Sequence, residues 1–154
     1  MDNGAKVKAF EGLIIQNGPW SLWATITFRR PVDSSEAIKR FKTFMRNLNT
    51  RDEILIHNFA WCFVLLDRGS GREGVHIHAL IRGIHPLNAM KLEKKCEKHF
   101  GISKVVPYVP SIQPNATLYL AQKYALSTLA DFSFMKIDSR IRVKSMMQRT
   151  RIQL

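Results

Sequence analysis

Residues 59–81 read FAWCFVLLDRGSGREGVHIHALI. Two apolar runs flank a short link that contains three glycines, and this pattern predicts two antiparallel strands joined as a hairpin. In the second run, His76 and His78 are separated by one residue, so both imidazoles are expected on the same face of the sheet. Asp67 ends the first run and should lie beside them. The hairpin therefore predicts a cluster of two histidines and one carboxylate.

Imidazole nitrogen and carboxylate oxygen are common ligands of divalent metals. We interpret His76, His78 and Asp67 as a candidate metal site with positions left for water and for a substrate phosphate. Glu73, in the predicted turn, is the second choice for the oxygen ligand. The alternative is that both histidines are polar residues on an exposed sheet face and that Asp67 is a turn residue. The remaining histidines, interpreted as surface or structural residues, are His57, His85 and His99.

The charge of the chain indicates a polyanionic partner. The 154 residues include 24 Lys and Arg but 12 Asp and Glu, a formal net charge of +12. Nucleic acid is the first candidate, and an acidic membrane surface or a ribosomal context are the alternatives. Because no apolar run is long enough for a bilayer and the N-terminus lacks a secretory h-region, we expect a cytoplasmic protein with no membrane partner. Cys62 and Cys96 should be free, buried thiols.

The rest of the chain supplies elements in an order that fits one domain, residues 1–154. Prolines confine the extended stretch 105–110 to a sheet edge or an irregular crossing. Residues 1–20 have no sustained period apart from the short apolar run at 13–15, and they are interpreted as an arm or a short edge strand. The order strand, helix, hairpin, helix, edge strand, helix predicts an α+β fold with helices packed on an antiparallel sheet. The other predicted elements are a strand at 23–28, helices at 37–48, 86–100 and 116–130, and a mixed, basic segment at about 132–154.

The first of these helices is predicted in most detail. Asp33 and Glu36 resemble a capping pair at its start. Apolar residues then recur at helical spacing, with lysines and arginines between them. The pattern indicates an amphipathic helix with a basic outer face.

The third helix carries a candidate reactive group. Tyr119 and Tyr124 lie about 140° apart around its axis, so only one is expected to face the metal site. Tyr124 lies away from the broad apolar side and is the better placed to point into a polar site, because its neighbours on the helix are Thr117, Leu120, Ser127 and Thr128. Tyr119 has Lys123 one turn further on as a partner. Either tyrosine is also explained as a packing residue with its hydroxyl at the surface.

Together these motifs resemble those of HUH endonucleases, in particular rolling-circle replication initiators (Rep proteins) of plasmids and viruses. The resemblance rests on WATITF at 23–28, Asp67 with GVHIHAL at 74–80, and the helix with Lys123 and Tyr124. It covers roughly residues 22–127. Many family members have a Tyr-x-x-Lys-Tyr-x-x-Lys pattern, and here Leu120 and Ser127 replace its first tyrosine and last lysine.

The resemblance implies a ferredoxin-like or RRM-like fold and Mn²⁺ or Mg²⁺ held by the two histidines and the acid. It also implies that Tyr124 or Tyr119, assisted by Lys123, attacks single-stranded DNA at a replication origin and leaves a 5′-phosphotyrosine link. This nicking and joining would initiate rolling-circle replication. Because the chain has no Gly-rich phosphate loop, a helicase and a polymerase are expected as separate proteins. An HUH transposase or relaxase is the alternative.

Basic and aromatic side chains near these motifs are candidates for binding the DNA strand by phosphate contacts and base stacking. Each one alone is also explained as a solvated charge or a core aromatic. A competing function of another class is a non-catalytic RNA-binding module, which would stack bases on a basic antiparallel sheet. The candidates for phosphate contacts are Arg29, Arg30, Arg68 and Arg72, and those for stacking are Trp23, Trp20 and Tyr108.

Overall fold

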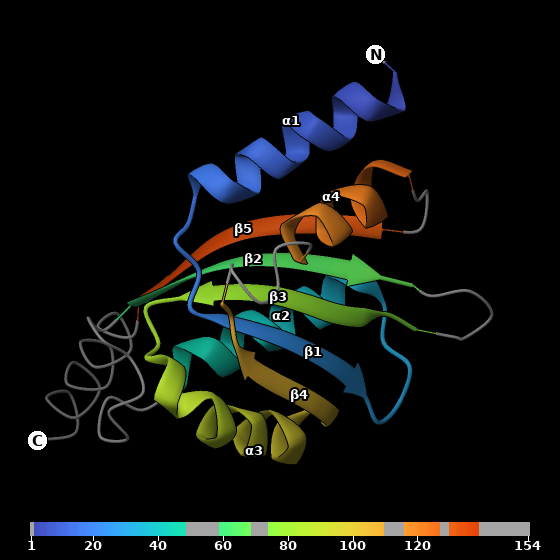
Figure 1. Ribbon diagram of the computed structural model, residues 1–154. Coiled ribbons are helices and arrows are strands. Elements are labelled where there is room, and N and C mark those ends of the chain that lie inside the picture. Colours follow the sequence, from blue (N-terminus) through green and yellow to red (C-terminus); the bar gives the residue numbers. More distant parts are fainter. Residues whose placement is uncertain (1, 49–58, 69–73, 110–115, 127–129, 139–154) are drawn as a thin grey trace, which may run out of the picture.

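The computed structural model describes residues 2–48, 59–68, 74–109, 116–126 and 130–138. Its strands form one antiparallel five-stranded sheet in the order β4-β1-β3-β2-β5 (Figure 1). The strands are β1 (Leu22–Phe28), β2 (Phe59–Asp67), β3 (His76–Arg82), β4 (Gly101–Pro107) and β5 (Ala130–Asp138). The helices are α1 (Asn3–Gln16), α2 (Ser34–Arg46), the 3₁₀ turn η2 (Pro86–Asn88), α3 (Ala89–His99) and α4 (Ala116–Leu126).

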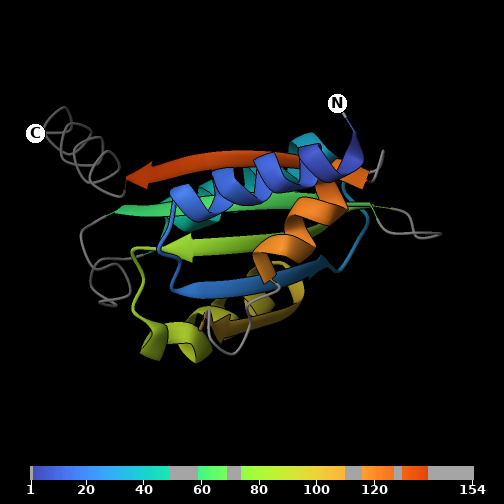
Figure 2. The ribbon, with the colours of Figure 1, turned by 45° about the horizontal axis from the view of Figure 1, so that its top comes forward.

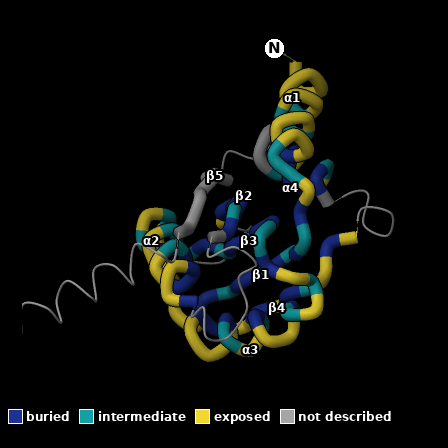
Figure 3. Tube along the Cα trace, turned by 90° about the vertical axis from the view of Figure 1, so that its left-hand side faces the viewer, coloured by how far each residue is buried: buried dark blue, intermediate teal, exposed yellow. Residues whose placement is uncertain are grey.

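Helices cover both faces of the sheet. Helices α1 and α4 lie on one face, and α2 and α3 lie on the other (Figures 1 and 2). This arrangement confirms the predicted α+β fold with helices on an antiparallel sheet. Seen along the sheet edge, the inner strands are mostly buried, whereas the outer sides of the helices are exposed (Figure 3).

A core of aromatic rings joins α2 and α3 to their face of the sheet. The Phe100 ring lies 4.9 Å from Phe44 and 5.5 Å from Phe28, both edge to face, which is a favoured geometry for aromatic pairs. The start of α2 is as predicted, because the Asp33 carboxylate accepts a hydrogen bond of 2.8 Å from the Glu36 backbone N–H. This cap satisfies a backbone donor that helix geometry leaves unpaired.

On the other face, a second core packs α1 and α4 against the sheet. Leu80 and Phe63 of the central strands are fully buried there, together with Leu120 of α4 and Ile14 of α1. The buried Trp20 indole donates a hydrogen bond of 3.0 Å to the Ile14 carbonyl. The end of α1 is thus tied to the chain that enters β1.

Two terminal segments differ from the prediction. Residues 3–16 form helix α1 instead of an arm or an edge strand. In the apolar run 13–15, Ile14 is fully buried but Leu13 and Ile15 are exposed, so the sequence carries no helical stripe of apolar residues. Residues 130–138, interpreted as mixed, form the edge strand β5 beside β2. At the opposite edge, β4 confirms the predicted edge strand.

The two cysteines are free and buried, as predicted. Burial raises the pKa of Cys96 to about 12 and also raises the pKa of Cys62, so both thiols remain protonated at neutral pH. Within the described ranges, no helix has both the length and the apolar character that crossing a membrane requires.

At Gly101, the backbone of β4 lies close to the backbone of β1. Its φ is +145°, and a Cβ at this position would lie 2.5 Å from the Thr27 carbonyl oxygen. We expect Gly101→Ala to lower the free energy of unfolding by about 2 kcal/mol or more, because backbone atoms cannot rotate away from the clash.

The matched control is Gly12→Ala in α1, where nothing lies within 4 Å of the new Cβ. This exchange should be neutral or stabilise by up to about 1 kcal/mol. Urea unfolding measures both variants. Equal effects of the two substitutions would contradict the close packing at Gly101.

Candidate active site on the sheet

Strand register brings the predicted metal ligands to one end of the sheet. His76 lies directly opposite Asp67 of β2 and opposite Thr27 of β1. His78 lies opposite Thr25. Since directly paired residues have Cβ atoms about 4.5 to 5.5 Å apart, the carboxylate and both imidazoles share one face and one neighbourhood.

Two threonines of β1 contact the histidines through the Nδ1 side of each ring. The Thr27 hydroxyl lies 3.1 Å from His76 Nδ1, and the Thr25 hydroxyl lies 3.4 Å from His78 Nδ1. Such contacts orient an imidazole and leave its Nε2 for another partner. No role was predicted for these threonines, although alternation along the predicted strand at 23–28 puts both on one face.

The Asp67 carboxylate lies close to two basic side chains of the site. It is 7% exposed, and its Oδ2 lies 2.7 Å from the Lys123 ammonium nitrogen and 3.8 Å from His78 Nε2. The hydrogen bond to Asp67 raises the pKa of Lys123, so the ammonium stays charged. Burial lowers the pKa of His78 in spite of the nearby carboxylate, so this imidazole is neutral at neutral pH and can act as a ligand.

Tyr119 of α4 packs over the same place. Its ring centroid lies 6.0 Å from that of His78, edge to face, and 6.2 Å from that of Trp23. The tyrosine remains 41% exposed. Because Tyr119 and Lys123 are one helical turn apart, α4 presents a phenol and an ammonium to the histidine and the carboxylate together.

Two of the four residues that favoured Tyr124 over Tyr119 do not lie on an exposed polar side of α4, because Thr117 is 5% exposed and Leu120 is 0% exposed. Both residues belong to the packed side of the helix. The other two, Ser127 and Thr128, lie outside the described residues, so the choice between the tyrosines stays a prediction. Tyr124 lies in α4, but its side chain is outside the described part of the structure.

The predicted phosphate contacts lie at the same end of the sheet, where β1 and β2 end. Arg30 and Arg68 are exposed there. The Arg29 guanidinium instead donates hydrogen bonds to the Glu97 carbonyl at 2.6 Å and to the Lys98 carbonyl at 3.2 Å, at the end of α3. Arg29 therefore has a structural contact that the sequence did not predict. Arg72, the fourth candidate for phosphate contact, and Glu73, the second choice for the oxygen ligand, lie outside the described residues.

Trp20 and Tyr108 are not available for base stacking, because they are only 6% and 9% exposed. Trp23 is partly buried against Tyr119 and His78. Two of the other histidines have structural contacts, as predicted: His85 accepts a hydrogen bond of 3.1 Å from the Leu87 N–H, and the His99 ring packs 5.2 Å from Phe44. The third, His57, lies outside the described residues.

The imidazole nitrogens and the carboxylate oxygens suit a divalent cation, although these side chains do not surround a position for one. Among the described residues, no group of three or more His, Cys, Asp or Glu side chains is arranged to hold a metal ion. In an octahedral site with ligands at about 2.1 Å from the cation, adjacent ligands lie about 3.0 Å apart and opposite ligands about 4.2 Å apart. The 3.8 Å between His78 Nε2 and Asp67 Oδ2 lies between these two values, so the two side chains must move closer together to bind one ion as adjacent ligands. Lys123 already places one cation on Asp67.

Comparison of the chain with protein-family models, with curated proteins and with solved structures gave no match.

The titration of His78 makes the free energy of unfolding fall as the pH falls. Its pKa is lowered from the ordinary value of 6.5 by burial, so the unfolded chain binds a proton that the native state does not. The stability from His78 is present above about pH 6.5 and is lost as the pH falls through the native-state pKa. In chelator, His78→Gln should flatten the fall in unfolding free energy between about pH 7 and 5. Urea unfolding at several pH values measures this, and an equally steep fall in the variant would contradict it.

Proposed function

We propose that this protein is a metal-dependent endonuclease and strand transferase that nicks and rejoins single-stranded DNA through Tyr119. The observation that carries the proposal is the grouping of Tyr119, His78, Asp67 and Lys123 at one end of the sheet. A phenol beside a neutral imidazole, a carboxylate and an ammonium is the set of groups needed for attack on a phosphodiester. The role fits rolling-circle initiation, and the same step serves transposases and relaxases.

The ligands for the metal would be His76, His78 and Asp67, with Mn²⁺ or Mg²⁺ as the ion. When bound, the ion withdraws charge from the scissile phosphate and helps to fix it. The chain prepares the ligands in two ways. Burial keeps His78 neutral, and the threonine hydroxyls hold both imidazoles by Nδ1.

Tyr119 supplies the nucleophile. The phenol gives up its proton to solvent, and its oxygen forms a bond to phosphorus while the bond from phosphorus to the 3′ oxygen breaks. That oxygen takes up a proton from solvent, so the step consumes no net proton. The products are a 5′-phosphotyrosine link and a free 3′-hydroxyl. Lys123 is charged and lies one turn away on α4, where its ammonium would offset the negative charge of the attacking oxygen. Since the link conserves the phosphodiester energy, a 3′-hydroxyl can reverse the step without a nucleotide cofactor.

A DNA strand has access to this site from the side of β1 and β4. Tyr119 is 41% exposed. On the same sheet face, Ile102 lies opposite Thr27 and is 80% exposed, and Lys104 lies opposite Thr25 with 71% of its side chain exposed. An apolar surface beside a cation can accept a base and a phosphate.

The RNA-module alternative has less support. A module of that kind stacks bases on aromatic residues of an open sheet. Here α1 and α4 cover the central strands, and the aromatic residues Phe63, Trp20 and Tyr108 are buried on this face.

The decisive variant is Tyr119→Phe. We expect wild-type protein with Mn²⁺ and 3′-labelled single-stranded DNA of mixed sequence to form an adduct that survives denaturation, because the tyrosine keeps the 5′ phosphate. Tyr119→Phe should reduce the adduct by at least about 10³-fold, since no other group supplies the same oxygen. A chelator should abolish the adduct as well. Denaturing gels measure both effects.

Tyr124→Phe is the matched control, a loss of one phenol on the same helix, and it should retain the adduct. If Tyr124→Phe removes the adduct and Tyr119→Phe leaves it, the nucleophile is misassigned. If the double variant still forms it, the tyrosine mechanism is wrong.

Lys123→Met tests the competition for Asp67. An ammonium at 2.7 Å competes with any metal ion for the same carboxylate, so its removal should tighten Mn²⁺ binding about twofold to fivefold, the equivalent of about 0.5 to 1 kcal/mol. The same variant should form the adduct more slowly, because the charge near Tyr119 is gone. Calorimetric titration with Mn²⁺ measures the first effect, with Lys123→Arg as the control that keeps a cation. Weaker Mn²⁺ binding by Lys123→Met would contradict the assigned competition.

A further inference from the structure

The sheet face opposite the candidate active site carries a large positive charge. Helices α2 and α3 together contain eight Lys or Arg and three Glu, a net charge of +5 within the +12 of the chain. None of these residues takes part in the chemistry proposed above. The exposed basic residues of this surface, named here the helical face, are Lys39, Arg40, Arg46, Lys91, Lys94 and Lys98.

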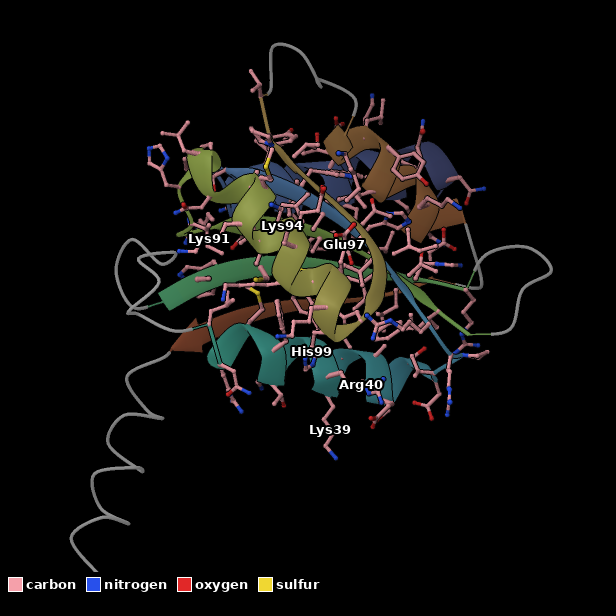
Figure 4. The ribbon with its side chains drawn as sticks, turned by 90° about the horizontal axis from the view of Figure 1, so that it is seen from below. Lys39, Arg40, Lys91, Lys94, Glu97 and His99 are labelled. Carbon is pink, nitrogen blue, oxygen red and sulfur yellow. The ribbon has the colours of Figure 1, made fainter. Side chains whose placement is uncertain are left out.

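The two helices present these charges on one continuous surface. Figure 4 shows Lys39 and Arg40 of α2 and Lys91 and Lys94 of α3 on the same side of the molecule. Phe44 of α2 contacts the ring of His99 at the end of α3 and the ring of Phe100 directly after it, and these contacts hold the two helices side by side. A groove of about 340 Å³ runs between them, with Lys95, Lys98 and His99 among its lining residues.

Two of the three acidic residues of this face have partners within the protein, and the third, Glu97, is exposed (Figure 4). Glu36 pairs with Arg40 at 3.0 Å. Glu93 accepts a hydrogen bond of 2.8 Å from the Val105 N–H and pairs with Lys104. Among the described residues, no ion pair involves Lys39, Lys94 or Lys98. The net field of the helical face is therefore positive and directed to solvent.

We propose that the helical face binds the phosphate backbone of duplex DNA, as a second nucleic-acid surface on the far side of the sheet from Tyr119. The 13 residues of α2 make a helix about 20 Å long, which matches about six base pairs at 3.4 Å each. Lysines and arginines spread over such a length suit contacts to successive phosphates, which position a protein without reading sequence.

The chemistry of the face favours paired over unpaired DNA. Binding of single strands relies on exposed aromatic rings for stacking, and Tyr119 on the opposite face is the one exposed aromatic side chain among the large hydrophobic residues described. The helical face offers many charges and one exposed ring, that of His99, which packs against Phe44. An acidic membrane is less suited, because the large apolar side chains exposed beside these charges are only Met90 and Leu87.

The test compares two charge removals of equal size in the full-length protein. Lys39→Gln with Lys94→Gln removes two charges from the helical face, and Lys6→Gln with Lys8→Gln removes two exposed charges from α1. Fluorescence anisotropy with a blunt 25-base-pair duplex in chelator gives the affinity across a salt series. For the first variant, the slope of log affinity against log salt should be about 1.8 shallower than for wild type. Its loss of affinity between about 50 and 200 mM salt should therefore be about ten-fold smaller than that of wild type. The α1 variant should match wild type.

Lys39→Arg with Lys94→Arg should restore the wild-type slope, because charge and not shape is required. Equal slopes for the Gln variants of the helical face and of α1 would overturn the proposal. It would also be overturned if the helical-face variant lost binding to vesicles of acidic phospholipid but kept duplex binding. No cleavage or metal enters this assay, so failure of the Tyr119 mechanism would leave a positive result standing.

Discussion

A buried carboxylate at the end of a central strand is the constraint on which the site depends. Asp67 is 7% exposed, and an ionised carboxylate removed from water needs a cation or several donors to offset its desolvation. Lys123 provides that cation at 2.7 Å, and it can do so only if α4 lies over β2 and β3. The same placement brings Tyr119, one turn earlier, against His78. One electrostatic requirement therefore sets the position of the candidate nucleophile.

The predictable part of this site is the part made by local periodicity. Alternation in an extended strand puts His76 and His78 on one face, and a glycine-rich link joins antiparallel neighbours, so Asp67 could be expected opposite them. The strand pairing bears this out. The capped start of α2 and the edge position of β4 follow from equally local signals, a capping pair and prolines.

The parts that were missed depend on packing between distant segments. The sequence of α4 alone does not show that Thr117 and Leu120 are buried. Leu120 packs in the core with Ile14 of α1 and with residues of the central strands, and Thr117 forms a side-chain hydrogen bond with Tyr108. The threonine contacts to the histidines need the pairing of β1 with β3, which joins residues about fifty positions apart. Helix α1 itself buries only Ile14, too little to leave a periodic signature.

The two faces of the sheet divide the charge of the molecule in a way that bears on function. On the face of Tyr119, Lys123 is committed to Asp67, and exposed apolar and aromatic groups lie beside the site. On the helical face, two acids are engaged with internal partners, and the lysines remain directed to solvent. The proposed function requires an unpaired strand at Tyr119, and the further proposal puts duplex DNA on the helical face. The sheet lies between these two surfaces (Figures 1 and 2), so under the two proposals the unpaired strand and the duplex do not compete for the same residues.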